Sequence, residues 1–208
     1  MKKNTIITLV LFLVLFVMGC NPGGSPAGQR QYFLMEVRRE GQTSKPQENV
    51  VLMVRPFSLA PGYHAKELTY RTSDLQYESD YYNQFIIDVG QQVAEQTRVW
   101  LSQSGYFAHV VPPGSTINAT HMLEGNITRL YGDFRDESNG QAFMRITFYL
   151  IDIIKRKPSI ILSESFEEQA PTAEATAESL VEAYQHCLQQ ILARFEKRLV
   201  QMSWATSI

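Results

Sequence analysis

The chain has very little cysteine. Only Cys20 and Cys187 occur among its 208 residues. If Cys20 carries a covalent modification, as argued below, no disulfide can form within the chain. Cys187 would then be a lone thiol in an oxidising compartment, and we expect it to be buried because an exposed thiol would be reactive there.

The sequence also lacks the motifs that carry catalysis. None of its four histidines has a zinc-ligand spacing, and no nucleophile elbow or phosphate-binding glycine loop occurs. His109 and His121 fall in predicted strands, where they could face solvent. Asp133, Asp136 and Glu137 form an acidic cluster, which we interpret as a solvated hairpin loop in preference to a metal or acid–base site. We therefore predict a non-enzymatic protein without a metal or a bound cofactor.

Positive charge is not in excess. The whole chain has 19 Lys+Arg against 21 Asp+Glu, and removal of Lys2 and Lys3 with a signal peptide would leave a net charge of about −4. A mildly acidic chain without a basic stripe argues against nucleic acid as a partner.

No apolar run in the sequence reaches the ~20 residues that a membrane-spanning helix needs. The longest extends from Ile6 to Met18 and is interrupted only by Thr8. It follows Lys2 and Lys3, and a basic start before a short apolar core is typical of a secretory signal. We predict a signal peptide over residues 1–19.

The expected cleavage site, Val17-Met18-Gly19-Cys20, resembles the lipobox of bacterial lipoproteins, although Met18 is larger than the usual residue. This resemblance predicts lipid attachment at Cys20; the alternative is a plain secretory signal with an incidental cysteine. Residues 20–30 contain proline, glycine and serine without an apolar pattern and read as a flexible tether. A single domain over residues 31–202 and a tail over 203–208 complete the predicted organisation.

Apolar patterning predicts a sheet. The expected strands cover residues 31–37, 50–54, 67–71, 75–78, 106–111, 122–131, 142–153 and 160–166. The continuous apolar run Val50–Val54 suggests a central strand that is buried on both faces. The strands over 122–131 and 142–153 are separated by glycine-containing turn sequence, which predicts a long hairpin.

Two helices are expected. The first would start near Tyr81–Phe85 and run to Ser104, with Gly105 as its stop. The second would run from Ala177 to about Met202, with Thr176 as its N-cap. Its apolar stripe includes Cys187, Leu188, Ile191 and Phe195, whereas Glu196 is placed on the polar face. These elements predict an α/β two-layer sandwich, in which a mixed, mainly antiparallel sheet carries two helices on one face.

The segment from Pro61 to Phe85 holds five of the ten tyrosines, interleaved with charged residues. Tyrosine and arginine are favoured at protein interfaces because they combine a large apolar body with polar atoms. The alternative is that these rings pack a small sheet edge onto the first helix. The interface candidates are Tyr63, Tyr70, Arg71, Asp74, Tyr77, Glu78, Tyr81 and Tyr82.

The same segment resembles a known family. The motifs are Pro56-Phe57, Ala60-Pro61-Gly62-Tyr63, Tyr70-Arg71, Ser73-Asp74, Tyr77-Glu78, Asp80 to Phe85, Trp100-Leu101, Leu123-Glu124-Gly125 and Leu130 to Phe134. They resemble the auxiliary lipoproteins of ABC-type transport systems, a family that includes the paraquat-inducible lipoprotein PqiC. The resemblance extends over about residues 32–199.

The resemblance implies a role in transport. Such lipoproteins accompany mammalian-cell-entry (MCE) domain proteins, a permease and often an ATPase, in systems thought to move lipids between the two membranes. It also implies a fold like the N-terminal TolB-type domain, and a possible homo-oligomer, because the PqiC branch forms rings. We therefore expect a periplasm-facing adaptor or conduit element; the alternative is a lipoprotein that binds lipid in its own pocket. Asn21 after the lipidated residue favours the outer membrane over the inner one.

Overall fold

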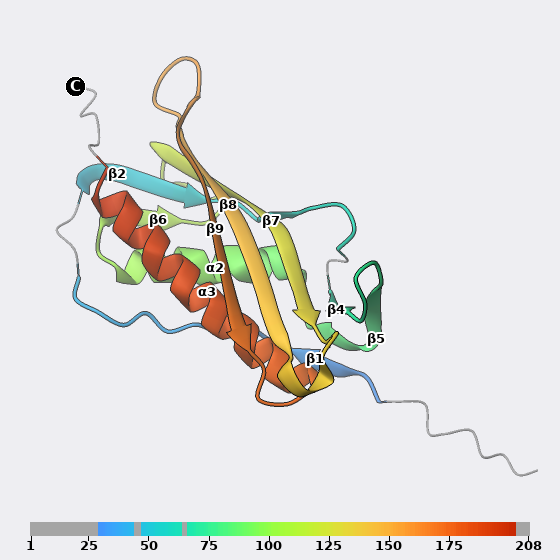
Figure 1. Cartoon of the computed structure of the whole chain (residues 1–208). Coiled ribbons are helices and arrows are strands. Elements are labelled where there is room, and N and C mark those ends of the chain that lie inside the picture. The colour runs from blue at the N-terminus through green and yellow to red at the C-terminus, as the bar shows by residue number, and fades with distance from the viewer. Residues whose placement is uncertain (1–28, 44–46, 64–65, 203–208) are drawn as a thin grey trace, which may run out of the picture.

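A computed structural model describes residues 29–43, 47–63 and 66–202. The predicted signal peptide, the predicted lipidation site Cys20, nearly all of the predicted tether and the C-terminal tail lie outside these ranges. Within them the chain forms nine strands, two α-helices and one short 3-10 helix (Figure 1). None of the helices in this part of the chain is both long and apolar enough to cross a bilayer.

The nine strands form one sheet. They are β1 (Gln31–Phe33), β2 (Gln47–Val54), β3 (Ser58–Leu59), β4 (Glu67–Arg71), β5 (Tyr77–Phe85), β6 (Phe107–Val111), β7 (His121–Asp133), β8 (Gln141–Asp152) and β9 (Ser159–Pro171). Strand β7 organises the sheet because both of its edges are paired. One edge pairs antiparallel with β8, which in turn pairs antiparallel with β9. The other edge pairs in succession with β2, β3 and β4, all parallel.

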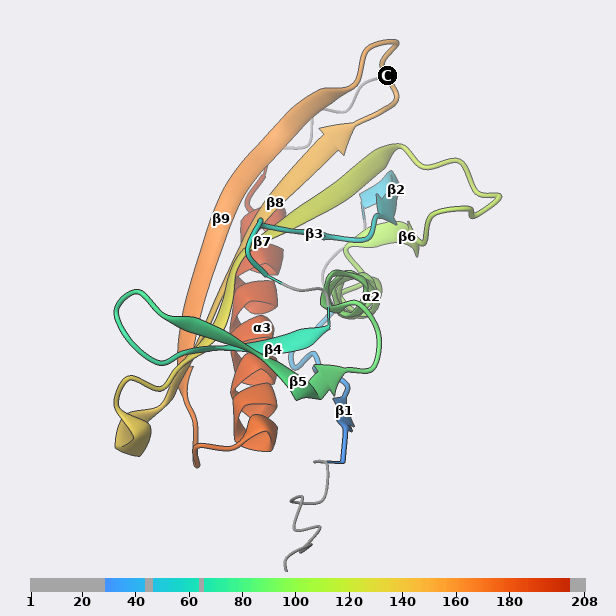
Figure 2. The same ribbon diagram turned by 90° about the vertical axis from the view of Figure 1, so that its right-hand side faces the viewer.

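The predicted fold class is confirmed. The sheet is mixed, and its two longest ladders, β7–β8 and β8–β9, are antiparallel. Helices α2 (Val89–Gln103) and α3 (Ala177–Val200) pack against it (Figure 2). Thr176 caps α3 as predicted, since its hydroxyl accepts a hydrogen bond from the Ser179 N–H at 3.2 Å. Gly105 follows α2 with a φ of +64°, which is the left-handed geometry that favours glycine after a helix.

The core lies between the helices and the sheet. Leu188, Ile191 and Phe195 have no exposed surface, which confirms the predicted apolar face of α3. The Phe195 ring stacks on Phe148 of β8, with the ring centroids 4.0 Å apart. Cys187 is also fully buried, as predicted, and burial raises the pKa of its thiol to about 12. The thiolate is therefore disfavoured at neutral pH, and this cysteine is protected from oxidation.

The predicted start of the first helix was wrong. Tyr81–Phe85 belongs to strand β5, and α2 begins at Val89. The Asp88 carboxylate caps it by accepting hydrogen bonds from the N–H groups of Gly90 and Gln91 at 2.7 and 3.3 Å. Phe85 is fully buried and pairs in register with Phe33 of β1. The pairing with β1 holds this segment in an extended conformation.

The first predicted strand is shorter than expected. Residues 34–37 lie outside β1, which ends at Phe33. Their backbone donors bond to side chains of α2: the Met35 N–H donates to Gln92 Oε1 at 2.9 Å, and the Val37 N–H donates to Gln96 Oε1 at 3.0 Å. The side chains of these two glutamines therefore accept the backbone hydrogen bonds that a neighbouring strand would otherwise accept.

Three burial predictions were also wrong. Strand β2 is central, yet Val51 and Met53 are half-buried, because only the face carrying Leu52 packs into the core. His121 is 8% exposed, and its burial lowers the pKa of the imidazole. Glu196 is not on a polar face, because its carboxylate accepts a hydrogen bond from Trp100 Nε1 at 2.7 Å and pairs with Arg39.

Candidate functional site

The eight interface candidates predicted from the sequence fall on or beside the β4–β5 hairpin. Tyr63, Tyr70 and Arg71 are half-buried, whereas Asp74 and Glu78 are exposed. The exposed tyrosines are Tyr77, Tyr81 and Tyr82, with 48%, 56% and 44% of their surface accessible. The hairpin therefore does not bring all eight residues to one surface. It separates most of them into three groups: Tyr77 in a row of aromatic rings, Tyr81 and Tyr82 in a bulge of β5, and Arg71 and Asp74 among the ion pairs at the tip of the hairpin.

The aromatic row, which we define as Tyr77, Tyr131 and Phe143, crosses three strands. Tyr77 meets Tyr131 edge-on, with ring centroids 5.5 Å apart, and Tyr131 stacks on Phe143 at 5.1 Å. Tyr131 and Phe143 are paired residues of β7 and β8, next to the pair Leu130 and Met144 that points into the core. Since neighbouring residues point to opposite sides of a strand, the row lies on the sheet face away from the core.

Ion pairs tie the tip of the hairpin to the end of β7. Arg135 Nη1 lies 2.6 Å from Asp74 Oδ1, and Arg135 Nη2 lies 2.9 Å from Asp133 Oδ2. Arg71 adds weaker contacts to the same two carboxylates at 3.8 and 3.6 Å, while its guanidinium lies 5.8 Å from the Tyr77 ring centre. These ion pairs join the tip of the hairpin to the end of β7, next to the aromatic row.

The predicted acidic loop is only partly a loop. Asp133 ends β7 and is 8% exposed, and hydrogen bonds from Arg135 lower the pKa of its carboxyl despite that burial. Asp136 instead caps the 3-10 helix η1 (Glu137–Asn139) by accepting a hydrogen bond from the Ser138 N–H at 3.0 Å. In the part of the chain that the structure describes, no group of three His, Cys, Asp or Glu residues could hold a metal ion.

A bulge in β5 is built around the carboxylate of Asp80. The β4–β5 register shifts so that Glu67 pairs with Gln84 while Leu68 pairs with Asp80. The Asp80 carboxylate accepts hydrogen bonds from the Tyr82 N–H at 2.8 Å, the Asn83 N–H at 3.0 Å and Asn83 Nδ2 at 2.7 Å. Partial burial opposes ionisation of Asp80, but these hydrogen bonds outweigh it and lower the carboxyl pKa. The charged Asp80 thus holds Tyr81 and Tyr82 at the surface.

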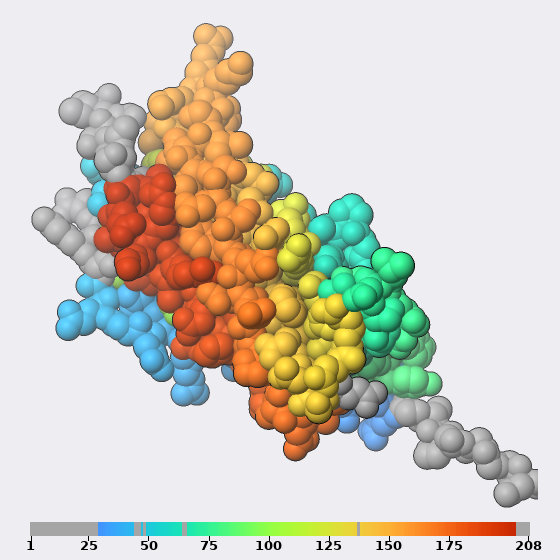
Figure 3. Space-filling view, in the orientation of Figure 1, coloured from blue at the N-terminus to red at the C-terminus, as the bar shows by residue number. Residues whose placement is uncertain are grey.

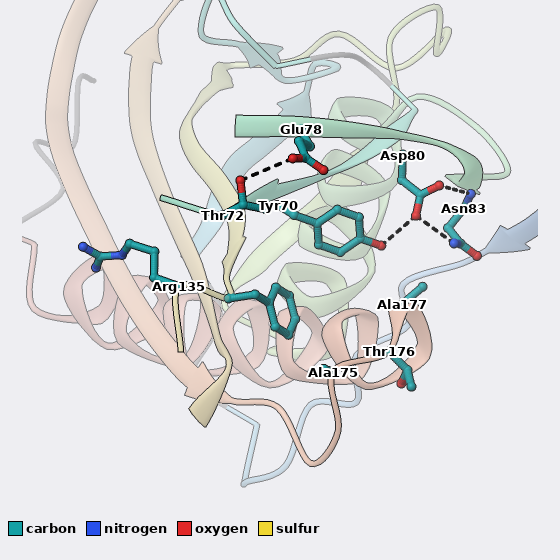
Figure 4. A pocket seen from close by; sticks show the side chains of 10 residues that line it. Tyr70, Thr72, Glu78, Asp80, Asn83, Arg135, Ala175, Thr176 and Ala177 are labelled. Atoms are coloured by element: carbon teal, nitrogen blue, oxygen red, sulfur yellow. Dashed lines mark hydrogen bonds between the residues drawn. The ribbon is translucent and has the colours of Figure 1, made fainter. Parts of the chain in front are cut away.

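Tyr70 completes this arrangement from β4. Its hydroxyl donates to Asp80 Oδ2 at 3.0 Å, and its ring meets Phe134 edge-on at 5.7 Å (Figure 4). Burial, followed by the nearby charge of Asp80, raises the pKa of the phenol well above its usual value. Tyr70 therefore acts as a neutral donor that supports the bulge, and only part of its ring is available to a partner.

A cavity of about 840 Å³ lies below Tyr70, between the hairpin, the β7–β8 connection and the first turn of α3 (Figure 4). Its lining is largely polar or charged and includes Glu78, Asp80, Asn83 and Arg135. Asp80 and Tyr70, whose pKa values are both shifted, are joined to each other by a hydrogen bond. The cavity suits polar contacts and lacks the apolar lining that a lipid chain requires.

Comparisons with known proteins supply the remaining evidence. A comparison with curated proteins gives no match. The family model described as "ABC-type transport auxiliary lipoprotein component" matches residues 32–195. The chain belongs to this family. It is therefore an auxiliary lipoprotein component of ABC-type transport, and the match covers the entire β4–β5 hairpin and the aromatic row.

Solved structures agree with the fold of this auxiliary lipoprotein. A protein from Xanthomonas campestris superposes with a TM-score of 0.69 at 15% identity, covering 83% of this chain and 99% of that one. An uncharacterised protein superposes with a TM-score of 0.62 at 14% identity, covering 82% and 99% of the two chains. At these identities the similarity shows a shared fold and nothing about function.

Sequence reasoning missed four residues of this region. Tyr131 and Phe143 complete the aromatic row, while Phe134 and Arg135 connect the hairpin to the end of β7. The signal that was available is the hairpin formed by β7 and β8, which puts residues 131 and 143 opposite each other once its register is known.

Proposed function

We propose that this auxiliary lipoprotein is a non-catalytic adaptor in an MCE-type system that moves lipids between membranes. In this proposal the lipid on Cys20 anchors it to the outer membrane, and the domain binds an MCE-domain partner or a neighbouring copy in a ring. The observation that carries the proposal is the aromatic row, which lies on a sheet face that neither helix covers and within the segment matched by the family model.

The aromatic row has the properties of a binding surface. Tyr77 is half-exposed, while Tyr131 below it is only 6% exposed and is held between two rings. Such a row is already ordered, so a partner that covers it orders few additional side chains. Arg71 and Asp74 form a charged border, which is the usual composition of an interface rim.

The alternative function, a lipid-binding module with its own pocket, predicts an apolar space between the sheet and the helices. Phe148, Phe166 and Phe195 occupy the space under α3, with all three ring pairs within 5.9 Å. The large cavity beside α3 is mainly polar, as described above. The adaptor role is therefore better supported.

Replacing Tyr77 with alanine is expected to weaken partner binding by about 2 kcal/mol or more while the domain stays folded, because hot-spot rings contribute this much to interfaces. Pull-down measures binding to the MCE-domain partner, and sedimentation of the purified protein measures its self-association. Circular dichroism verifies that the variant is folded. Tyr149→Ala is a matched control, because it removes a half-buried tyrosine from β8 at about 20 Å from Phe143 along the strand. If both folded variants bind and assemble like the wild type, the row is not an interface.

Anchoring has a separate test. Labelled palmitate is expected to enter the wild-type protein and to be absent from Cys20→Ala, since the thiol is the acceptor. Equal labelling of both proteins would contradict lipidation at this position. Membrane fractionation then tests the sorting role of Asn21: recovery of the wild type with the inner membrane would contradict the outer-membrane assignment.

A further inference from the structure

A second surface, distinct from the aromatic row, lies where the described chain begins. We call it the tether-side patch and define it as Arg30, Tyr32, Lys66, Tyr81, Tyr82 and Ile86. Tyr32, Tyr81 and Ile86 each have more than half of their surface accessible, at 55%, 56% and 53%. Large apolar side chains are thus exposed together beside the chain segment that leads to Cys20.

Side-chain contacts join Arg30, Tyr81 and Tyr82, and backbone pairing places the other members of the patch beside them. The Arg30 guanidinium lies 4.1 Å from the centre of the Tyr81 ring, and Tyr81 meets Tyr82 edge-on at 5.4 Å. Strand β1 pairs with β5 so that Tyr32 is opposite Gln84, and the Ile86 N–H donates to the Phe33 carbonyl at 2.9 Å. Lys66 Nζ reaches the Ile86 carbonyl at 3.2 Å, which places a second cation at the patch.

The composition of the patch fits a phospholipid headgroup layer. Tyrosine is enriched at the membrane–water interface because its ring prefers the apolar side and its hydroxyl prefers water. Lysine and arginine extend towards phosphate and are attracted to anionic lipid by about 1 kcal/mol each near the surface. Arg30 and Lys66 lie at the same patch as the three tyrosines.

The position of the patch also fits. Nine residue steps separate Cys20 from Gln29, and a chain of this length spans at most about 30 Å. In a flexible state its root-mean-square length is only about 15–18 Å. A lipid on Cys20 would therefore hold this end of the domain close to the bilayer, where weak contacts are favoured by a high effective concentration.

We propose that the tether-side patch rests on the headgroup layer of the membrane that holds the lipid of Cys20, and so fixes the orientation of the domain. The inference rests on the lipid anchor of the proposed function. Orientation follows because the patch and the aromatic row occupy different parts of the molecule. Contact through the patch leaves the row free for a protein partner.

A competing surface sits at the other end of the molecule. Lys155, Arg156 and Lys157 form the tip of the β8–β9 hairpin, flanked by Ile154 and Ile160 with 55% and 59% of their surfaces accessible. Figures 1 and 3 show this hairpin at the end opposite to the tether-side end. Strand β8, which leads to this hairpin, has twelve residues and extends over about 40 Å. An anchor at Cys20 therefore favours the tether-side patch.

The test uses the mature lipidated protein in vesicles of phosphatidylethanolamine and phosphatidylglycerol. An environment-sensitive fluorophore is attached at Tyr82→Cys or, as the matched control, at Arg156→Cys; lipid blocks Cys20 and burial protects Cys187. Lipids with a nitroxide headgroup are expected to quench the label at position 82 and to leave the label at position 156 unquenched. Adding Tyr81→Ser with Ile86→Ser should lower the quenching at position 82 in a protein that circular dichroism shows to be folded.

A charge variant provides a second measurement that does not alter apolar packing. With Arg30→Gln and Lys66→Gln, quenching at position 82 should become the same with and without phosphatidylglycerol. Quenching at position 156 instead of 82 would overturn the proposal in favour of the basic hairpin. No quenching at either position would also overturn the proposal. Vesicle sedimentation then shows whether the patch or the anchor is at fault. Protein that sediments with the vesicles retains its anchor, whereas protein that stays in solution shows that the proposed anchor is wrong.

Discussion

Replacing Phe195 with alanine is expected to lower the free energy of unfolding by about 3–5 kcal/mol, the usual range for a buried aromatic residue. Phe195 has no exposed surface, stacks on Phe148 at 4.0 Å and meets Phe166 edge-on at 5.9 Å. Three elements, α3, β8 and β9, meet at this cluster, so they cannot readily close the cavity. Urea denaturation should show a lower midpoint at an unchanged slope.

Gln190→Ala is the matched control for this prediction, because Gln190 is an exposed residue of the same helix. Surface substitutions of this kind usually change stability by less than about 0.5 kcal/mol. Similar midpoints for the two variants would show that α3 does not dock through Phe195.

The second large effect is expected from Glu196→Ala, at about 3 kcal/mol. Arg39 Nε and Nη2 donate to the Glu196 carboxylate at 2.9 and 2.7 Å, and Trp100 Nε1 donates at 2.7 Å. The Arg39 side chain is only 7% exposed, so truncation of Glu196 leaves a nearly buried guanidinium without its carboxylate. An arginine side chain is not deprotonated in folded proteins, so Arg39 cannot relieve the loss by giving up its proton.

Glu95→Ala is the appropriate comparison for Glu196→Ala. Glu95 pairs with Arg98 at 2.6 Å on the surface of α2, and its side chain is 52% exposed. A solvent-exposed pair of this kind contributes about 0–1 kcal/mol. Equal losses of stability for the two variants, measured by chemical denaturation, would mean that burial does not strengthen the dependence of Arg39 on Glu196.

Local periodicity was enough to predict much of the fold. The stripe that includes Leu188, Ile191 and Phe195 identified α3 and its buried face, because a single face docks on the sheet. The same reasoning failed at α2 because Tyr81 and Phe85 continue the four-residue spacing of Val89. The pairing of Phe85 with Phe33, a contact between distant residues, and the pairing of β5 with β4 distinguish strand from helix there.

The candidate site was predictable in part. The tyrosine-rich composition led to the β4–β5 hairpin, and the interface role of its side chains remains a prediction. Composition did not reveal that Asp80 divides the tyrosines by holding Tyr81 and Tyr82 in a bulge. It also could not pair Tyr77 with Tyr131, because that contact depends on the arrangement of β4, β5 and β7. Glu196 was misplaced for the same reason: its partner Arg39 is 157 residues away in sequence.

The position of α3 along the chain has a consequence for folding. All nine strands precede this helix, yet it covers the inner face of β8 and β9. During synthesis the sheet would therefore lack part of its core until α3 has been made. The parallel pairings of β7 with β2, β3 and β4 add many contacts between distant residues, and such topologies fold slowly because loops must close before contacts form. Both features delay completion of the native fold, and the apolar inner face of β8 and β9 stays exposed until α3 packs against it.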